Sequence, residues 1–495
     1  MEIRNHFFKS QIWFNKLSYK KIVLILFAAS FFYILPVILA NTFYIDDMNR
    51  TVEGYNWNRD GRFISSKLMH LLSNQSRVVY SLFPYSTIFS TFLLSLSGFI
   101  LSYSLGVRDK IQLTFSGLII ATCPFLLEIL TYKFDCLPIS LSIFCAVMPF
   151  VWYKHKIRFF ITSFLFLFLI FGFYQTTALS YAIILCVFLI KDIWTNQYKQ
   201  ILINGSLALV SFTLAFLFYQ FCLKQSGITM VDTQRSEFIF GNPDFNSLLK
   251  QRWDGFKDLL FSLIKSSYNI SLIIACIAAV SGLGAFLYVK RSSNRTILNI
   301  LLTVFLVLFI FLLAISINLV VMEPRWSPRS LIGFSFVLLL LFYTVIQLPK
   351  KFQLTGYFAF LPLFFYSFLI SSQLGIFLKN QDEYSDFIIS MVAPEVLKHN
   401  DLKLVIDGQI QYAPRNATVN YGTMPFIYKL APLYENYSFY WGIIRMNKFG
   451  IISSTYVFGE ERENVVSNKE SLPIVQQNKY YTLRIQPPYA LIEFH

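Results

Sequence analysis

The sequence predicts a polytopic α-helical membrane protein that ends in a small α/β domain, and its composition and apolar runs indicate this class. The chain has 495 residues, of which 55% are hydrophobic and only 14% are charged. A soluble protein carries about 25% charged residues, and the mean hydropathy of this chain is +0.54. Apolar runs of roughly 20 residues, the length that crosses a bilayer, recur along it. The chain is therefore expected to lie mostly in lipid.

The first membrane span is expected over Ile22–Ala40 and is expected to be retained, because the polar stretch before it is too long for a signal peptide. In Phe63–Leu82, apolar residues follow helical spacing with polar residues interspersed, which predicts a helix lying in the membrane interface. Together with the first span, the remaining apolar runs give about 11 spans. These runs are Tyr85–Gly106, Ile111–Thr131, Asp135–Tyr153, Phe159–Phe173, Thr176–Ile190, Ile201–Leu223, Tyr268–Val289, Ile297–Val321, Ser330–Leu348 and Phe352–Ser371.

The basic residues fit one orientation of these spans. Lysines precede the first span, so the N-terminus is predicted to be cytoplasmic. The basic loops then all fall on that same side: Arg108–Lys110, Lys154–Arg158, Lys191–Lys199, Lys290–Arg295 and Lys350–Lys351. The net charge of +15 is thus explained by topology, and no nucleic-acid partner is expected.

The opposite side is predicted to receive the first loop (41–84), several short turns, the long loop 224–267 and the whole tail. The tail mixes a helical stretch, Asp382–His399, with four strand-like stretches, LKLVIDG, SSTYVFG, YYTLRI and YALIEF. The predicted organisation is a transmembrane catalytic module over 1–371 and a C-terminal α/β domain over 372–495. The cysteines and histidines are scattered without metal-type spacing, so no metal cluster is expected.

Two adjacent acids follow the first span in YIDDMNR (Tyr44–Arg50). Repulsion between Asp46 and Asp47 tends to raise the pKa of one of them, and a carboxylate in such a place is a candidate general base. Asp47 is slightly preferred because it is closer in sequence to Arg50. The alternative is that the pair only solvates a helix end.

Further polar side chains are expected on the same face as the acid pair. Several arginines suit a phosphate group, since the guanidinium fork matches its oxygens, and a carboxylate suits the removal of a proton from a hydroxyl. Both features together describe sugar transfer from a lipid-linked sugar phosphate, although an ion-pair network would look similar in sequence. The candidate binding residues are Arg50, Trp57, Arg62, Lys133, Asp135, Gln175, Glu323, Arg325 and Arg329.

The segment DDMNRTVEGYNWNRDGR (Asp46–Arg62) resembles the start of the catalytic loop in the serotype-converting O-antigen glucosyltransferases of the glucosyltransferase II-like family, which are GT-C type enzymes. YKFD (Tyr132–Asp135), YQTT (Tyr174–Thr177) and PRWSPR are also similar to that family. The duplicated Pro-Arg leaves open whether Arg325 or Arg329 takes the family position. The residues that carry the main resemblance are Asp46, Asp47, Arg50, Gly54, Trp57, Gly61 and Arg62.

The resemblance implies a GT-C-like fold and an inverting transfer of glucose from undecaprenyl-phosphate glucose to a lipid-linked O-antigen repeat. The reaction would take place at the periplasmic face of the bacterial inner membrane and would depend on a lipid-linked glucose synthase and a flippase. Such serotype conversion is typical of bacteriophage-borne systems. No cofactor is expected, although paired carboxylates are able to bind a divalent metal.

Two other functions remain open from sequence. An O-antigen polymerase would carry its key arginines in a large mid-chain loop, where Arg235 and Arg252 lie. A flippase or transporter for a polyprenyl-linked sugar would be expected to show internal repeats, and none is visible.

Overall fold

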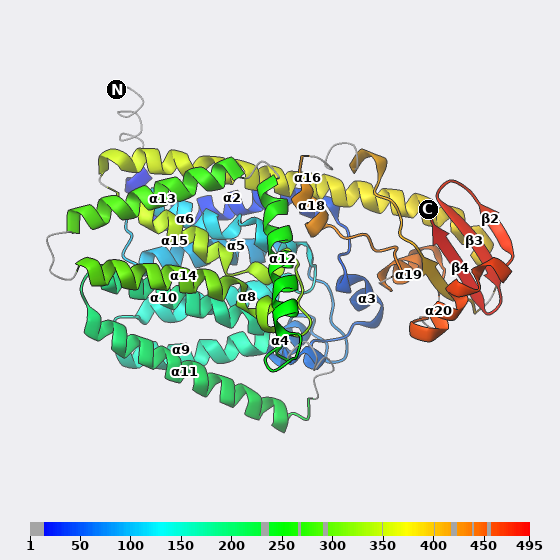
Figure 1. Ribbon diagram of the computed structural model, residues 1–495, viewed down its shortest axis with the longest axis horizontal. Coiled ribbons are helices and arrows are strands. Elements are labelled where there is room, and N and C mark those ends of the chain that lie inside the picture. The colour runs from blue at the N-terminus through cyan, green and yellow to red at the C-terminus, as the bar shows by residue number, and fades with distance from the viewer. Residues whose placement is uncertain are drawn as a thin grey trace.

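The computed structural model describes residues 14–228, 237–265, 269–290, 296–348, 350–399, 401–416, 423–437, 440–452 and 457–495. Most of these residues are helical, and the long helices lie roughly parallel in one bundle, with a small sheet beyond one end (Figure 1). The acid pair of the first loop lies at that same end of the bundle, on α3 (Asp46–Glu53).

Seven helices of the described residues are long and apolar enough to span a membrane. The class predicted from sequence, a polytopic helical membrane protein, is therefore confirmed, while the number of about 11 spans stays a prediction. These helices are α2 (Tyr19–Ala40), α5 (Tyr85–Ser104), α9 (Lys156–Phe173), α10 (Ala178–Trp194, preceded by η3, Gln175–Thr177), α11 (Tyr198–Gln225), α14 (Thr296–Val320) and α16 (Lys350–Val396). Shorter apolar helices are α8 (Cys136–Val147, continued by η2, Met148–Trp152), α13 (Asn269–Lys290) and α15 (Phe334–Ile346, preceded by η5, Pro328–Leu331).

The predicted span Ile111–Thr131 is broken in the structure. It consists of α6 (Lys110–Ala121) and α7 (Pro124–Thr131), which meet at an angle of 58°. Pro124 explains the break, because proline has no N–H for a continuing helix and is well suited to the first turn of a new one. Every residue of α7 is buried, so this short helix lies inside the bundle.

In two of the predicted loops, the helices differ from those expected from sequence. The helix expected in the membrane interface is α4, which spans Phe63–Leu72 and ends before the predicted Leu82. The loop 224–267 contains a helix that was not predicted, α12 (Phe245–Leu263), which runs across the direction of the spans (Figure 1). Charged residues interrupt its apolar positions, so it lacks the continuous apolar run by which the spans were found.

The last span and the tail are joined without a linker. Helix α16 has 47 residues and runs through the predicted boundary between residues 371 and 372. It packs closely on α2: Gly375 is required there, because a Cβ at this position would lie 2.4 Å from the carbonyl oxygen of Pro36. The Ser371 hydroxyl also donates to the Tyr33 carbonyl oxygen (2.5 Å).

The C-terminal residues form a four-stranded mixed sheet in the order β1-β4-β3-β2. Strand β1 pairs in parallel with β4, and the other neighbours are antiparallel. The strands are β1 (Lys403–Asp407), β2 (Ile474–Gln477), β3 (Tyr481–Gln486) and β4 (Tyr489–Phe494), and the helices around them are α18 (Pro425–Leu430), α19 (Trp441–Met446), η6 (Asn447–Phe449), α20 (Gly459–Ser467) and η7 (Lys469–Ser471). Most of the predicted strand SSTYVFG lies outside the described residues.

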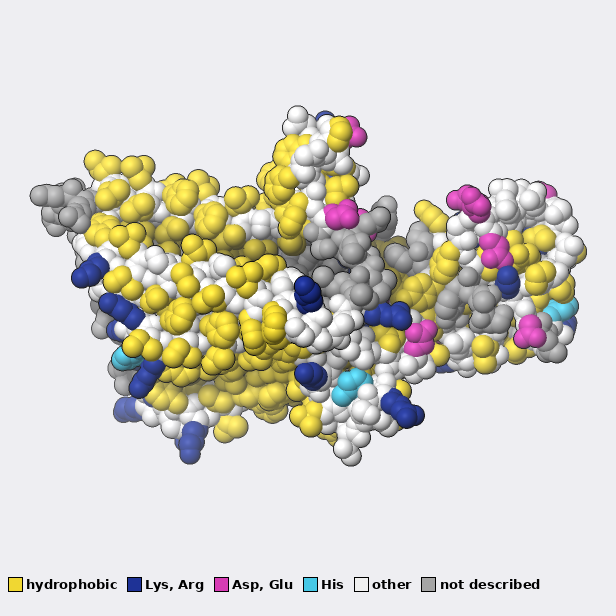
Figure 2. Space-filling model, turned by 90° about the horizontal axis from the view of Figure 1, so that it is seen from below, with side chains coloured by type: hydrophobic (Ala, Val, Ile, Leu, Met, Phe, Trp, Pro, Cys, Tyr) yellow, Lys and Arg dark blue, Asp and Glu magenta, His cyan; other side chains and the backbone are white. Residues whose placement is uncertain are grey.

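The core of the sheet depends on the end of α16. Ile388, Ile389 and Val392 of that helix pack with Leu404 of β1 and Leu483 of β3 in one buried cluster. Hydrophobic side chains cover the visible face of the bundle, whereas acidic side chains are visible only from its middle toward the sheet (Figure 2). A group of Lys and Arg side chains lies at the opposite end (Figure 2).

Candidate active site

The candidate site lies where five segments meet at the sheet end of the bundle. The first loop supplies α3, η1 (Asn58–Asp60) and α4, and the turn between α7 and α8 supplies residues 132–135. The remaining segments are η3, η5 with the stretch before it, and the C-terminal stretch from α18 to α19. Hydrogen bonds join residues up to 386 positions apart in sequence, as between Tyr44 and Leu430.

The acid pair opens helix α3 directly after a strained residue. Ile45 has φ 49° and ψ −115°, a conformation that β-branched residues rarely adopt and that costs about 1–3 kcal/mol. The surrounding structure holds it in place: the Tyr44 hydroxyl donates to the Leu430 carbonyl oxygen at 2.6 Å, and the Asp47 N–H donates to the Tyr44 carbonyl oxygen at 3.0 Å. These hydrogen bonds hold Ile45 in this conformation, and the conformation sets the direction in which α3, with Asp46 and Asp47, continues from the first span.

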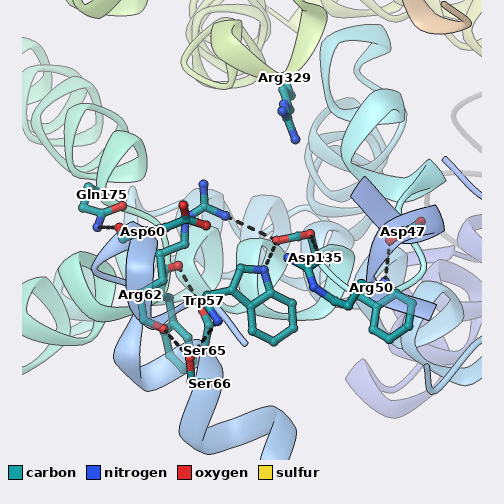
Figure 3. A network of polar contacts seen from close by, with 12 residues as sticks. Asp47, Arg50, Trp57, Asp60, Arg62, Ser65, Ser66, Asp135, Gln175 and Arg329 are labelled. Atoms are coloured by element: carbon teal, nitrogen blue, oxygen red, sulfur yellow. Dashed lines mark hydrogen bonds and ion pairs between the residues drawn. The ribbon is translucent and has the colours of Figure 1, made fainter. Parts of the chain in front are cut away.

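Asp135 is the centre of the polar network (Figure 3). Its carboxylate accepts hydrogen bonds from Arg50 Nη1 at 2.7 Å, Trp57 Nε1 at 2.6 Å and Arg62 Nη1 at 3.3 Å. Burial by itself would raise the pKa of Asp135, but the charges of Arg50 and Arg62 outweigh it, so the pKa is lowered. The carboxylate is therefore ionised and fixes two guanidinium groups and one indole relative to each other.

The two arginines of this network differ in exposure. The Arg50 side chain is only 3% exposed. Its guanidinium lies over the ring of Trp57 at 4.2 Å and over that of Tyr55 at 4.6 Å. The Arg62 side chain is 21% exposed, and its Nε has no hydrogen-bond partner among the described residues. That Nε is itself buried, so Arg62 is the more accessible of the two arginines through the rest of its guanidinium group.

Glycines shape the loop that carries Trp57 and Arg62. Gly54 ends α3 at φ 62°, and a Cβ there would lie 2.9 Å from Cβ of Val78. Gly61 ends η1 at φ 74°. Left-handed backbone of this kind favours glycine, which gives a physical reason for the two glycines in the segment that resembles the family.

Asp46 and Asp47 have different surroundings. Asp47 is fully buried, and its carboxylate accepts from the backbone N–H groups of Lys133 at 2.7 Å and Phe134 at 3.4 Å. Burial raises the pKa of Asp47 to about 7, against the lowering effect of these hydrogen bonds. Asp46 is half-buried, and none of the hydrogen bonds found among the described residues involves its side chain. Its charge acts on Arg50 and on Arg329.

Lys133 and Gln175 connect the site to neighbouring segments of the chain. The Lys133 ammonium donates to Asn41 Oδ1 at 2.8 Å and lies 4.1 Å from the centre of the Phe43 ring. Burial lowers its pKa to about 8. Gln175 Nε2 donates to the Asp60 carbonyl oxygen at 3.0 Å (Figure 3), which ties η3 to the first loop. Both side chains already have protein partners.

Arg329 approaches the network from another direction (Figure 3). Its backbone N–H donates to Glu128 Oε2 at 2.7 Å, and its Nε lies 3.6 Å from Glu128 Oε1. The guanidinium lies 4.7 Å from the centre of the Tyr132 ring. Tyr132 is fully buried, and its hydroxyl has no hydrogen-bond partner among the described residues. Arg329 thus adds another guanidinium group on the side of the network away from the first loop.

Glu128 was missed from sequence, although a signal was present. It is the only acid in the predicted span Ile111–Thr131, and an ionisable residue within a span is a functional candidate by default. Glu323 and Arg325, by contrast, were predicted for the site and are exposed on the stretch before η5. Arg325 still lies within electrostatic range of Glu128.

The described residues contain no group of three His, Cys, Asp or Glu side chains placed to hold a metal ion. The absence of a cofactor stays a prediction.

The fold and the site define a many-span membrane protein with an acid and arginine cluster at one end of its bundle. Residues 35–341 match the family model described as "Glucosyl transferase GtrII", and the chain belongs to this family. The match contains every candidate residue from Asp46 to Arg329, and it confirms the family to which the sequence analysis compared the chain.

A relative from Salmonella phage P22, described as an uncharacterized 55.3 kDa protein in the gtrB 5′ region, is 23% identical over 200 residues. The aligned part covers 40% of this chain and 41% of that relative. The chain thus matches less than half the length of this relative. No solved structure matches the chain.

Proposed function

We propose that the protein transfers glucose from undecaprenyl-phosphate glucose to a lipid-linked O-antigen repeat. The observation that carries the proposal is that a half-buried carboxylate, Asp46, lies within electrostatic range of Arg50 and Arg329 at the end of the bundle where Asp135 holds Arg50 and Arg62. Membership of the GtrII family supports the glucosyl group as the moiety transferred.

The arginines are proposed to bind the phosphate of the donor. The Arg62 side chain is 21% exposed, and its guanidinium lies 4.6 Å from the centre of the Tyr174 ring, which restricts its plane. A fixed guanidinium fork matches phosphate oxygens and also stabilises the charge that grows on the leaving phosphate. Arg50 is too deeply buried for this role and is proposed to position Asp135 instead.

Asp46 is proposed as the general base. A base must touch the hydroxyl that it deprotonates, and Asp46 is the more exposed of the two acids, whereas both oxygens of Asp47 are engaged by backbone N–H groups. This differs from the slight preference for Asp47 that the sequence alone gave. Asp47 is proposed to hold the turn that carries Lys133 and Asp135 against α3.

The reaction is a single displacement. The acceptor hydroxyl gives its proton to Asp46, and its oxygen forms a bond to the anomeric carbon of glucose. The bond from that carbon to the phosphate oxygen breaks, and undecaprenyl phosphate leaves with the electron pair. Because entering and leaving oxygens lie on opposite sides of the carbon, the anomeric configuration is inverted. No metal ion takes part in this scheme, and transfer in the presence of EDTA tests that.

The site is proposed to face the periplasm, with the protein in the bacterial inner membrane. Helix α9 begins at Lys156 and ends at Phe173 beside η3, so the basic loop before it lies at the end of the bundle far from the site. Figure 2 shows Lys and Arg side chains gathered at that end. Under the positive-inside rule this end is cytoplasmic, and lipid-linked sugars reach the other side after flipping.

The experiment compares surface polysaccharide by mass spectrometry in bacteria that carry the lipid-linked glucose synthase and flippase, with and without this protein. One added hexose per repeat is expected with the wild type. The Asp46→Asn variant should lose about 10²- to 10⁴-fold of the transfer, since it removes the proton acceptor at constant size. Unmodified polysaccharide with well-inserted wild-type protein would contradict the proposal.

The O-antigen polymerase alternative loses part of its support. Arg252 is only 2% exposed, and its guanidinium donates to the carbonyl oxygens of Val321 (3.1 Å) and Met322 (2.7 Å), as a structural brace. Arg235 lies outside the described residues.

A further inference from the structure

We propose that the saccharide of the acceptor binds along a row of aromatic side chains in the C-terminal stretch, formed by Trp441, Tyr440 and Phe458. This inference rests on the proposed function and assigns the acceptor side of the same site. It gives the C-terminal residues a direct role in recognition, beyond the part of the chain that matches the family model.

The row begins against the helix that carries the acid pair. Helix α19 packs on α3 through a buried cluster that contains Met48 and Ile444, with Trp441 and Tyr440 at its edge. In Figure 1, α3 lies between the end of the bundle and α19. The acid pair is thus bordered by the arginine network on the bundle side and by aromatic rings on the other.

The three rings are continuous and partly exposed. The ring centres of Trp441 and Tyr440 are 5.8 Å apart, and those of Tyr440 and Phe458 are 6.3 Å apart. Trp441 and Tyr440 are half-buried, and Phe458 is 51% exposed. Contiguous apolar surface that stays partly exposed is a candidate binding surface.

Asp46, the proposed general base, lies close to this row of aromatic side chains. Burial raises the pKa of the Tyr440 hydroxyl, and the charge of Asp46 raises it further, so the two groups are within electrostatic range. The same charge acts on Arg329 of the phosphate side. Asp46 is therefore within electrostatic range of both sides, and it opens the helix α3 on which α19 packs.

The geometry of the displacement decides which substrate uses the row. The entering oxygen and the leaving phosphate must lie on opposite sides of the anomeric carbon. Because the arginines are proposed to bind the phosphate, the acceptor must approach from the other side. A saccharide presents flat faces of C–H groups, which pack on aromatic rings, and hydroxyls at its edge, which reach polar groups. The nearby cation Arg445 is engaged by Asp382 at 2.7 Å and by Asp386 at 2.9 Å, so the row itself suits a neutral ligand.

The test measures transfer by purified full-length protein in nanodiscs. The donor is undecaprenyl-phosphate glucose, and the acceptor is the lipid-linked repeat extracted from a host strain that lacks the gene. Trp441→Ala and Phe458→Ala are each expected to raise the acceptor KM about 3- to 10-fold, as the loss of one ring contact predicts, with the donor KM unchanged.

Tyr480→Ala is the matched control, because Tyr480 is a half-buried tyrosine of the same C-terminal region whose ring contacts Tyr384 on α16, 6.2 Å between centres. It should leave both KM values unchanged. Phe458→Ala removes an exposed ring away from α3, so it remains informative if the α19 variant fails to fold. A fall in kcat at constant acceptor KM, or an equal rise in Tyr480→Ala, would overturn the inference. If the wild type itself transfers no glucose, the proposed function fails and this inference fails with it.

Discussion

Replacing Asp135 by Asn tests whether one buried carboxylate organises the arginine network. The variant keeps an acceptor oxygen but removes the charge that Arg50 meets at 2.7 Å and Arg62 at 3.3 Å. Burial lowers the pKa of Arg50, but the charge of Asp135 and other negative groups raises it above its usual value, so Arg50 stays charged. The substitution therefore leaves a guanidinium of 3% exposure without its direct counter-ion.

The expected magnitude follows from that burial. Breaking a buried ion pair by removing one partner costs about 3–5 kcal/mol. For a chain of this length, a loss of that size corresponds to a fall of roughly 3–10 °C in the midpoint of thermal unfolding. Transfer should fall about 10²-fold, because Arg62 and Trp57 lose the group that positions them.

The assay combines thermal unfolding in detergent with transfer in proteoliposomes. Asp60→Asn is the control: Asp60 is exposed at the same end of the bundle, and the described hydrogen bond from Gln175 uses its carbonyl oxygen rather than its side chain. In the double variant Asp135→Asn with Arg50→Met, the unpaired charge is gone, so part of the stability should return. An unchanged unfolding midpoint in Asp135→Asn would refute the reasoning. So would a double variant whose loss of stability equals the sum of the losses in the two single variants within about 0.5 kcal/mol.

The same assays check the other expectations. Because burial raises the pKa of Asp47 to about 7, this carboxyl gains its charge as the pH rises through about 7; transfer should rise over that range in the wild type and be flat in Asp47→Asn, and a rise in both proteins would contradict this. The raised pKa also makes the wild type lose stability as the pH rises from about 4 to about 7, so the stability of Asp47→Asn relative to the wild type should improve over that window and stay constant above it. Arg62→Lys and Arg329→Lys keep the charge but lose the fork, so each should lower transfer about tenfold, whereas the exposed Arg325→Lys should not; full activity in all three would remove the phosphate role. Glu128→Gln takes the charge from the partner of Arg329 and should lower the unfolding midpoint and the transfer rate together; an unchanged midpoint would show that the pair is not structural.

The candidate site could be predicted in part because its residue types are rare in this chain. An acid pair beside arginines stands out where few residues are charged, and Asp46, Arg62 and Asp135 were identified on that ground. Glu128 was missed because a single acid inside an apolar run was taken as part of a span. Helix α12 was missed because its charged residues interrupt the apolar run that marked the other helices.

The sequence by itself determined the class of the protein and the end of the bundle at which polar residues collect. Hydrophobic runs and basic loops are read by the membrane locally, one segment at a time, so they can be read from the chain in the same way. Which acid is buried, which arginine stays accessible and which tail residues border α3 were decided only by tertiary structure. These properties depend on contacts between residues as distant as Tyr44 and Leu430, 386 positions apart, which no local pattern encodes.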